Sequence, residues 1–381
     1  MAGRVALASR QCFSNRVALA SRQCFSNVGS SVKISRRSLL ADRVALASRQ
    51  CFSKVGSDVK VSRRSLLAGA VAGGLSSLCR SALAETEAAP RQTRPTRAGY
   101  FDIHVHLTQE WFGRDKGPVT ADLLLHWMDA HDIAQAAVLP LVSPEAFWYP
   151  ITTDFVLREC REHADRLVPF CAIDPRTLAT HLPEKQQVVD VLRRYVEAGA
   201  RGFGEHKPRL PIDDPLSMKL YEACDEVGLP VLFHLDNQAN IDKPGLPGLD
   251  RVLTTFPNLT LIGHGKGWWA SIAGGLMQLD LHVGYPQGRI APGGAIDALM
   301  DKHRNLYADL SSSGAHALLR DPEFGHAFLL RRADRLLFGT DFYDLEQKAF
   351  QQFELFQRHK VPDDVRASIS SGNARRLLKL A

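Results

Sequence analysis

From residue 99 onward, the chain alternates between short apolar runs and longer amphipathic stretches. The apolar runs are rich in Val, Ile, Leu and Phe, which is typical of buried strands. The stretches between them carry apolar residues at three- and four-residue spacing, which predicts helices. The predicted strands end at or near His106, Pro140, Asp174, Glu205, His234, His264, Leu310 and Asp341. The predicted helices include residues 121–130, 154–163, 187–198, 215–227 and 248–256.

Eight strands that are each followed by a helix predict a (β/α)8 barrel, the TIM-barrel fold, in a single domain over residues 99–381. An open, doubly wound α/β sheet is the alternative. The strand count disfavours that sheet, and so does the lack of a glycine-rich nucleotide-binding loop. We therefore predict a barrel whose strand ends share one site.

Polar residues that can bind a metal ion stand at the ends of several predicted strands. His104 and His106 are two residues apart, so both project from the same side of a strand end. In a barrel, the carboxyl ends of different strands converge on one site. We expect a shared site for a divalent ion, formed by His104, His106, Glu205, His234, His264 and Asp341.

The first 84 residues differ in charge from the rest of the chain. They hold 14 of the 47 basic residues but only two of the 41 acidic ones, so their net charge is +12 and the remainder carries −6. The overall charge of +6 therefore reflects this leader and does not indicate a nucleic-acid partner. The leader is repetitive, with RVALASRQCFSN at residues 4–15 and 16–27 and a near-copy at 43–54.

The end of the leader has the order of an export signal. Arg63 and Arg64 precede a Gly/Ser-rich apolar run, and residues 82–84 (ALA) have the form of a cleavage site. The pair resembles a twin-arginine signal, so we expect the twin-arginine export machinery as a partner and the periplasm as the location. The run is shorter than the roughly 20 residues of a membrane span. We interpret residues 1–84 as the leader and 85–98 as a linker.

Several motifs follow one another in the later domain. They are D-x-H-x-H at Asp102 to His106, VLFHLD around His234, GHG around His264, LFGTD ending at Asp341, and GNARRLL at residues 372–378. In this combination the sequence resembles the amidohydrolase superfamily. The most similar branch is the "amidohydrolase 2" group, which also holds aminocarboxymuconate-semialdehyde decarboxylase-like enzymes. The resemblance covers nearly the whole region after the leader and implies a metal-dependent enzyme.

The resemblance implies roles for the strand-end residues. His104, His106 and Asp341 would bind a divalent ion, and His234 would complete the site. His264 would polarise the substrate or carry a proton. Zinc is the expected ion, with manganese as an alternative, and one ion is favoured over two. The donor types fit independently, because such ligands leave a position open for water, whose pKa the ion lowers toward ~7.

The fourth predicted strand offers several candidates in the sequence GEHK. Strand alternation places Glu205 and Lys207 on one face and His206 on the other. Glu205 resembles the Glu of the superfamily's metal-dependent deoxyribonucleases, so a second ion on His234 and His264 stays open. We favour one ion with Glu205 as a ligand or beside the ligands. Lys207 either binds a substrate carboxylate or only pairs with Glu205.

Aromatic residues follow several predicted strands. Trp111 comes after the first, residues 147–149 after the second, and Trp268 with Trp269 after the sixth. Aromatic side chains at a pocket rim provide contact area and shape. We expect Trp111 and Trp268 to contact a small substrate with apolar or planar parts. Packing between long loops is the alternative, above all for Phe147 and Tyr149.

The sequence favours a metal-dependent hydrolase that acts on a lactone, ester or amide of a small, acid-like substrate. Asp341 would act as base and then as proton donor, and His264 would stabilise the oxyanion. The alternative is non-oxidative decarboxylation of an aromatic or unsaturated acid at the same site. Asp102, where such decarboxylases often have Glu, favours hydrolysis. An exported binding barrel without activity is a third hypothesis, and a homo-oligomer is compatible with the sequence.

Overall fold

The computed structural model describes residues 99–109, 117–179, 184–283 and 287–380. The expected leader and linker over residues 1–98 lie outside the described residues. The later domain is built on a set of parallel strands at the positions of the apolar runs. These strands are β1 (Tyr100–Val105), β2 (Ile133–Val138), β3 (Leu167–Pro169), β4 (Phe203–His206), β6 (Val231–His234), β8 (Leu261–His264), β9 (Leu306–Asp309) and β10 (Leu336–Leu337).

Backbone contacts close these strands into a barrel. Three strands pair in the order β1-β2-β3 and five in the order β10-β9-β8-β6-β4, and every pair is parallel. A bridge between Cys171 and Phe203 joins the chain after β3 to β4. A second bridge, between Val105 and Phe342, joins β1 to the chain after β10. The predicted (β/α)8 barrel is therefore confirmed.

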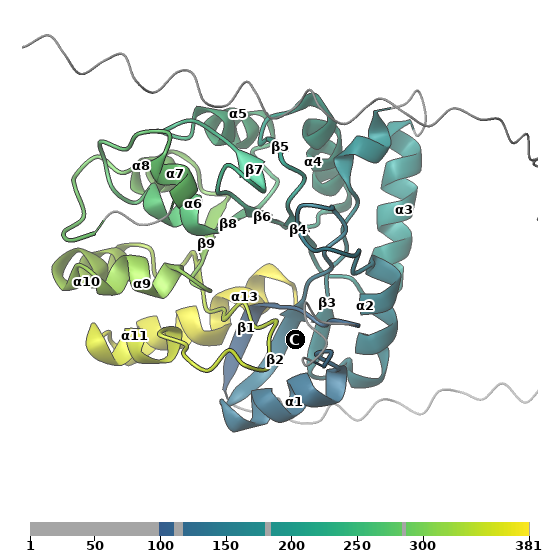
Figure 1. Cartoon of the computed structure of the whole chain (residues 1–381), viewed down its shortest axis with the longest axis horizontal. Coiled ribbons are helices and arrows are strands. Elements are labelled where there is room, and N and C mark those ends of the chain that lie inside the picture. The colour runs from purple at the N-terminus through teal and green to yellow at the C-terminus, as the bar shows by residue number, and fades with distance from the viewer. Residues whose placement is uncertain (1–98, 110–116, 180–183, 284–286, 381) are drawn as a thin grey trace, which may run out of the picture. The chain divides into compact units, whose positions relative to one another are not determined.

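Helices surround the ring of strands, whose labels from β1 through β4, β6 and β8 to β9 follow one another around the barrel in Figure 1. Helix α4 shows how the sequence sets the bounds: Asp214 accepts a hydrogen bond from Leu216 N at the start, and left-handed Gly228 follows the end. No helix in the described part of the chain is long and apolar enough to cross a membrane. The helices are α1 (Ala121–Ala130), α2 (Thr153–Cys160), α3 (Lys185–Glu197), α4 (Pro215–Val227), α5 (Pro247–Thr255), α6 (Lys266–Ala270), α7 (Asp280–Val283), α8 (Ala295–Lys302), α9 (Gly314–Leu319), α10 (Pro322–Arg331), α11 (Gln352–Arg358), α12 (Asp363–Ala367) and α13 (Asn373–Leu377).

Short elements complete the described domain. They are the two-residue strands β5 (Leu210–Pro211) and β7 (Asn240–Ile241), which pair with each other, and the single turns η1 (Arg161–His163), η2 (Pro175–Leu178) and η3 (Ser368–Gly372). The third barrel strand ends at Pro169, earlier than the predicted end at Asp174. The Asp174 carboxylate instead caps η2 by accepting a hydrogen bond from Arg176 N at 2.9 Å. The Asp-Pro pair therefore begins a helical turn, which corrects the prediction.

An apolar layer fills the barrel below the strand ends. Ile103 of β1, Leu232 of β6 and Ile262 of β8 belong to one buried cluster. Leu232 and Ile262 stand two residues before His234 and His264, respectively. Because alternate residues share a face of a strand, the two imidazoles point into the same interior one layer further along. The apolar layer is therefore the floor of the site.

Candidate metal centre

The two histidines of β1 point into the barrel at its carboxyl end. The register of β1 against β2 shifts between Asp102 and Val105, and such an irregularity re-aims the side chains that follow it. Both imidazoles are nearly inaccessible, at 0% for His104 and 2% for His106. Their Nε2 atoms lie 3.0 Å apart. The two-residue spacing therefore brings both rings to one point.

Each of these rings donates its Nδ1 proton to a fixed acceptor. Nδ1 of His106 donates to the carbonyl oxygen of Leu139 at 2.9 Å. Nδ1 of His104 donates to Oδ2 of Asp309 at 2.8 Å. Because a carbonyl and an ionised carboxylate only accept, neutral rings must hold their protons on Nδ1. Their Nε2 lone pairs then face each other, which a cation between them stabilises.

The surroundings of His104 attract positive charge. Burial lowers the pKa of this histidine, but Asp341, Asp309 and Glu205 outweigh burial and raise the pKa well above its ordinary value. A proton on Nε2 and a divalent ion are the two cations that can meet this charge. The two would compete for the same lone pair.

Two carboxylates complete a set of four ligand atoms. Oε2 of Glu205 lies 3.7 Å from Nε2 of His104 and 3.5 Å from Nε2 of His106. Oδ1 of Asp341 lies 3.7 and 3.6 Å from the same two atoms. Four ligands held ~2.1 Å from one ion in a tetrahedron are about 3.4 Å apart. Each carboxylate oxygen therefore lies at ligand spacing from both imidazole nitrogens, and His104, His106 and Asp341 form one group with metal-ligand spacing.

His264 reaches the same space from the end of β8. Its Nδ1 lies 3.0 Å from Oδ2 of Asp309 and 2.9 Å from Oγ of Ser311. Burial, followed by the charge of His104, lowers the pKa of His264. The ring is therefore neutral at pH 7, and its single proton sits on Nδ1, where the acceptors are.

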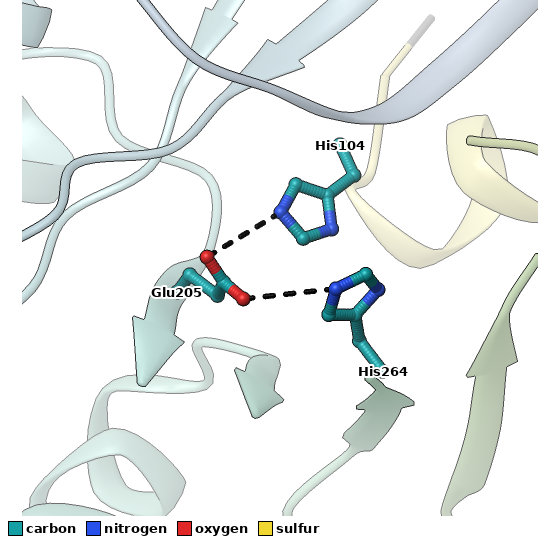
Figure 2. A group of neighbouring side chains, drawn as sticks. All are labelled: His104, Glu205 and His264. Atoms are coloured by element: carbon teal, nitrogen blue, oxygen red, sulfur yellow. Dashed lines mark ion pairs between the residues drawn. The ribbon is translucent and has the colours of Figure 1, made fainter. Parts of the chain in front are cut away.

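The other nitrogen of His264 faces the ligand atoms. Its Nε2 is buried and has no hydrogen-bond partner among the residues that the structure describes. It lies 3.7 Å from Oε1 of Glu205 and 3.8 Å from Oδ2 of Asp341. Figure 2 shows the Glu205 carboxylate reaching toward both His104 and His264, and these three residues form one group with metal-ligand spacing. A buried lone pair in this position suits a ligand or a base.

His234 and Lys207 contact the far oxygen of Glu205. Nδ1 of His234 lies 2.7 Å from Oε1 of Glu205, and its Nε2 lies 3.1 Å from Oδ2 of Asp236. Nζ of Lys207 lies 3.3 Å from the same Oε1. Burial raises the pKa of Glu205, but Lys207 and His104 outweigh it and hold this pKa well below its ordinary value. Glu205 is therefore ionised, and His234 lies beside it rather than in the four-atom set.

Asp341 has an unusual backbone conformation. Its φ of +57° lies in the left-handed region, which is strained for a residue other than Gly, Asn or Asp and is enriched at functional sites. Its side chain is 17% exposed, whereas that of Glu205 is 1% exposed. Burial raises the pKa of Asp341, but His104 and His106 lower it by a larger amount. The pKa of Asp341 therefore lies below its ordinary value. Asp341 is thus an ionised carboxylate with access to solvent.

Gly265 of the GHG motif allows two strand ends to approach. Its φ of +100° is unfavourable for residues with a side chain. A Cβ atom there would lie 2.7 Å from Cδ2 of His234 and 2.9 Å from the carbonyl oxygen of Leu235. The glycine therefore permits the close packing of His234 beside His264.

Comparison with known families assigns the described domain. The model of the amidohydrolase family matches residues 101–380 of the chain. The chain belongs to the amidohydrolase family. No curated protein sequence matches this amidohydrolase.

Solved structures with a similar backbone include three from bacteria. An uncharacterised TIM-barrel protein from Bordetella bronchiseptica has 19% identity and a TM-score of 0.48, with 74% of this chain and 98% of that chain covered. A probable 2-pyrone-4,6-dicarboxylic acid hydrolase from Acinetobacter baumannii, with citric acid bound, has 13% identity and a TM-score of 0.49, with 74% and 100% covered. A dihydroxybenzoic acid decarboxylase from a Polaromonas species, with manganese and 2-nitroresorcinol bound, has 17% identity and a TM-score of 0.46, with 74% and 97% covered.

Of the two tryptophans expected at a pocket rim of this amidohydrolase, the structure describes one, and it lies in the core. Trp111 lies outside the described residues. Trp268 is 0% exposed, and its ring packs edge-on against Phe233 with the centroids 5.7 Å apart. Phe233 alternates with the inward His234, so Trp268 packs on the outer face of the strands. This position in the core, away from a rim, gives Trp268 no surface to offer a substrate.

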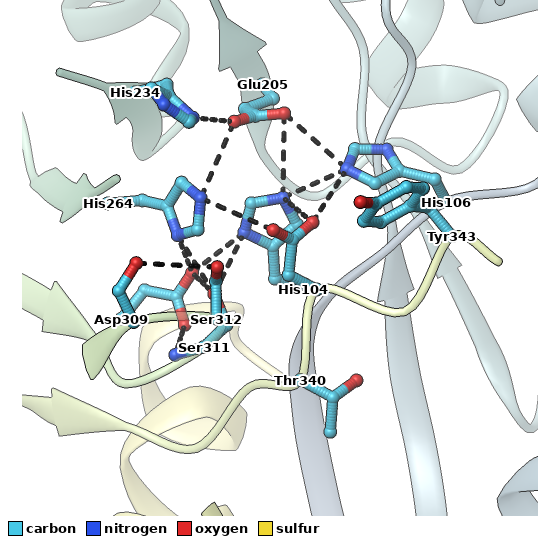
Figure 3. A network of polar contacts seen from close by, with 12 residues as sticks. His104, His106, Glu205, His234, His264, Asp309, Ser311, Ser312, Thr340 and Tyr343 are labelled. Atoms are coloured by element: carbon cyan, nitrogen blue, oxygen red, sulfur yellow. Dashed lines mark hydrogen bonds and ion pairs between the residues drawn. The ribbon is translucent and has the colours of Figure 1, made fainter. Parts of the chain in front are cut away.

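Sequence reasoning missed one residue that contacts two of the expected site residues. Asp309 ends β9 and is fully buried beneath His104 and His264, on the opposite side of the two rings from Glu205 (Figure 3). Its place after the apolar run LYA matches the places of the other strand-end residues. The strand-end signal that identified Asp341 therefore applied to Asp309 as well.

Proposed function

We propose that this amidohydrolase catalyses the metal-assisted, non-oxidative decarboxylation of a small aromatic or unsaturated carboxylic acid. His104, His106, Glu205 and Asp341 would hold the ion, with the Nε2 atom of His264 beside them. A divalent ion in this place, zinc or manganese, supplies the positive charge that holds an anionic substrate and offsets the charge it develops. The contacts of the chain's own residues support this reaction over hydrolysis.

The proton position on His264 carries the proposal. A hydrolase stabilises the oxyanion at the attacked carbon with a bound cation, with N–H or O–H donors aimed at it, or with both. His264 has its proton on Nδ1, held by Asp309 and Ser311, and it presents a lone pair toward the site. It therefore cannot donate to an oxyanion, which was the role that the sequence suggested for hydrolysis. Decarboxylation needs no such donor, because the electron pair of the broken bond stays on the substrate.

Lys207 gives the site a place for a substrate carboxylate. Its ammonium lies 3.3 Å from Glu205, and its side chain is 18% exposed. Burial lowers the pKa of Lys207, but the charges of Glu205 and Asp341 outweigh burial and raise this pKa above its ordinary value. The ammonium group is therefore charged. A fixed cation of this kind binds a carboxylate as a point charge.

Asp341 is the proton carrier in this proposal. The bond between the substrate carbon and its carboxylate breaks, carbon dioxide leaves, and the carbon takes up one proton in its place. With 17% of its side chain exposed, Asp341 can take a proton from solvent and pass it on, whereas Glu205 at 1% cannot. Asp341 returns to its ionised form after each turnover.

Hydrolysis of a lactone, ester or amide is the second candidate. The lowered pKa of Asp341 favours it, because an ionised carboxylate at a solvent-facing position is the base that a water attack requires. The two reactions differ in the fate of water and of the carboxylate.

The test is incubation of the metal-loaded protein with aromatic and unsaturated acids and with lactones of similar size, in water enriched in oxygen-18 and in heavy water. Decarboxylation predicts one carbon dioxide per substrate consumed and one deuterium on the product carbon. Oxygen-18 in the product without release of carbon dioxide would reject the proposal in favour of hydrolysis. The His104→Ala variant is the negative control for either reaction.

A further inference from the structure

We infer that Asp309 is a positioning residue that fixes the proton positions of His104 and His264 together and thereby presents both Nε2 lone pairs to the metal centre. The inference rests on the proposed metal site, but it holds for either candidate reaction. The two histidines lie 160 residues apart in the chain, and one carboxylate oxygen joins them.

The contacts of Asp309 define this role. Its Oδ2 lies 2.8 Å from Nδ1 of His104 and 3.0 Å from Nδ1 of His264, as the network in Figure 3 shows. The same oxygen accepts a hydrogen bond from Oγ of Ser311 at 2.6 Å, and Oδ1 accepts one from Ser311 N at 2.8 Å. Every group that faces this carboxylate in these contacts is a donor. The arrangement therefore requires a carboxylate and holds both imidazole protons away from the ligand atoms.

Asp309 is enclosed by the donors that contact it, which are the two imidazole Nδ1 atoms and the amide and hydroxyl of Ser311. Asp309 is 0% exposed, so bulk solvent does not compete with it as the acceptor. Removing the carboxylate would leave both imidazoles without their fixed acceptor.

The neighbouring strand makes room for this carboxylate. A Cβ atom at Gly339, in the motif LFGTD, would lie 2.5 Å from Oδ1 of Asp309 and 3.0 Å from Cβ of Ser311. A glycine at this position therefore serves the packing of Asp309 between β9 and β10. The Gly339→Ala variant would displace Asp309 while keeping every proposed ligand.

An amide cannot reproduce these contacts. In Asp309→Asn, the NH2 group must face either Ser311 N or the two imidazole nitrogens, and each of these is a donor to the native carboxylate. Where the NH2 group faces the imidazoles, His264 moves its proton to Nε2 and loses the lone pair that faces the site. Loss of such a supporting partner typically costs about 10- to 100-fold in metal affinity.

The experiment combines two measurements, made on the wild-type protein and on its variants. Nitrogen-15 NMR of the metal-free protein reports which ring nitrogen of His264 carries the proton, and competition with a chromogenic chelator gives the dissociation constant for zinc alone. We expect a proton on Nδ1 of His264 in the wild type, a new Nε2-protonated population in Asp309→Asn, and affinity that falls about 10- to 100-fold. Gly339→Ala should change both readouts in the same direction.

The matched control is Asp321→Asn. Asp321 is another buried aspartate, 5% exposed, that accepts hydrogen bonds from Ile290 N and Phe324 N at the start of α10. This variant should leave both readouts unchanged. A wild type with the His264 proton on Nε2, or an Asp309→Asn protein with unaltered protonation and zinc affinity, would overturn the inference. A substrate that proves to be hydrolysed would reject the proposed reaction and leave this result intact.

Discussion

The hydroxyl of Thr340 donates a 2.5 Å hydrogen bond to Oδ2 of Asp102. The amide of Thr340 donates to Oδ1 of the same carboxylate at 3.0 Å, and His104 N donates to that oxygen at 3.0 Å as well. Asp102 is fully buried, so it clamps the first barrel strand to the chain that follows the last. The D of D-x-H-x-H therefore supports barrel closure and the backbone of a proposed ligand. These contacts therefore explain why an Asp, rather than a Glu, stands at position 102.

Thr340→Val tests this clamp. The variant keeps the shape of the side chain but removes the donor, so a buried carboxylate oxygen loses its partner. We expect the free energy of unfolding to fall by about 1–3 kcal/mol. Urea unfolding of the metal-free protein measures it, and Thr340→Ser, which keeps the hydroxyl, should retain most of the stability. Equal loss in both variants would show that the methyl group, and not the hydrogen bond, matters.

The metal site predicts one bound ion that depends on the β1 histidines. Metal analysis of the purified protein should give one equivalent, and His106→Ala should lower this to near zero because it removes one of four facing ligand atoms. His206→Gln is the control, since His206 lies on the other face of β4 and its Nε2 contacts Ser217 Oγ at 3.3 Å. Two equivalents in the wild type would favour the two-ion alternative.

The barrel and the proposed ligands could be predicted because both follow from chain-local patterns. Each apolar run gives a strand, and the residue after the run stands at the carboxyl end, where parallel strands converge. His104 and His264 were found in this way although they lie far apart in sequence. Asp309 carries the same sequence signal. Its contacts with the two imidazoles, however, depend on the register of the strands and not on the residues next to it in the sequence.

Trp268 shows a second limit of sequence reasoning. An aromatic residue four positions after His264 is compatible with a pocket rim and with the outer face of the barrel. The conformation of the turn at Gly265 decides between these, and α6 carries Trp268 outward against Phe233. His234 is a similar case, because only the placement of Glu205 shows that Nδ1 of this histidine faces a carboxylate at 2.7 Å.

Lys207 is expected to determine the affinity for an acidic substrate. Lys207→Met removes the charge, and we expect KM for a carboxylic acid substrate to rise roughly tenfold or more while kcat changes less. Lys207→Arg should keep most of the affinity. Because Lys207 also pairs with Glu205, metal content must be measured in both variants. An unchanged KM in Lys207→Met with normal metal content would assign Lys207 to the ion pair alone.

His359 is expected to make the stability of the barrel depend on pH. It is 4% exposed and packs against Gly325 of α10, where a Cβ atom would lie 2.5 Å from its Cε1. Burial lowers the pKa of His359 below its ordinary value of 6.5. Below that pH the unfolded chain therefore binds a proton that the folded protein does not bind. The free energy of unfolding then falls as the pH drops from about 6.5, and it is steady above that pH. The slope is at most about 1.4 kcal/mol per pH unit. Urea unfolding between pH 5 and 8 measures this slope, and the difference between the wild type and His359→Phe isolates the contribution of this residue. If both proteins lose stability equally on acidification, His359 is not its source.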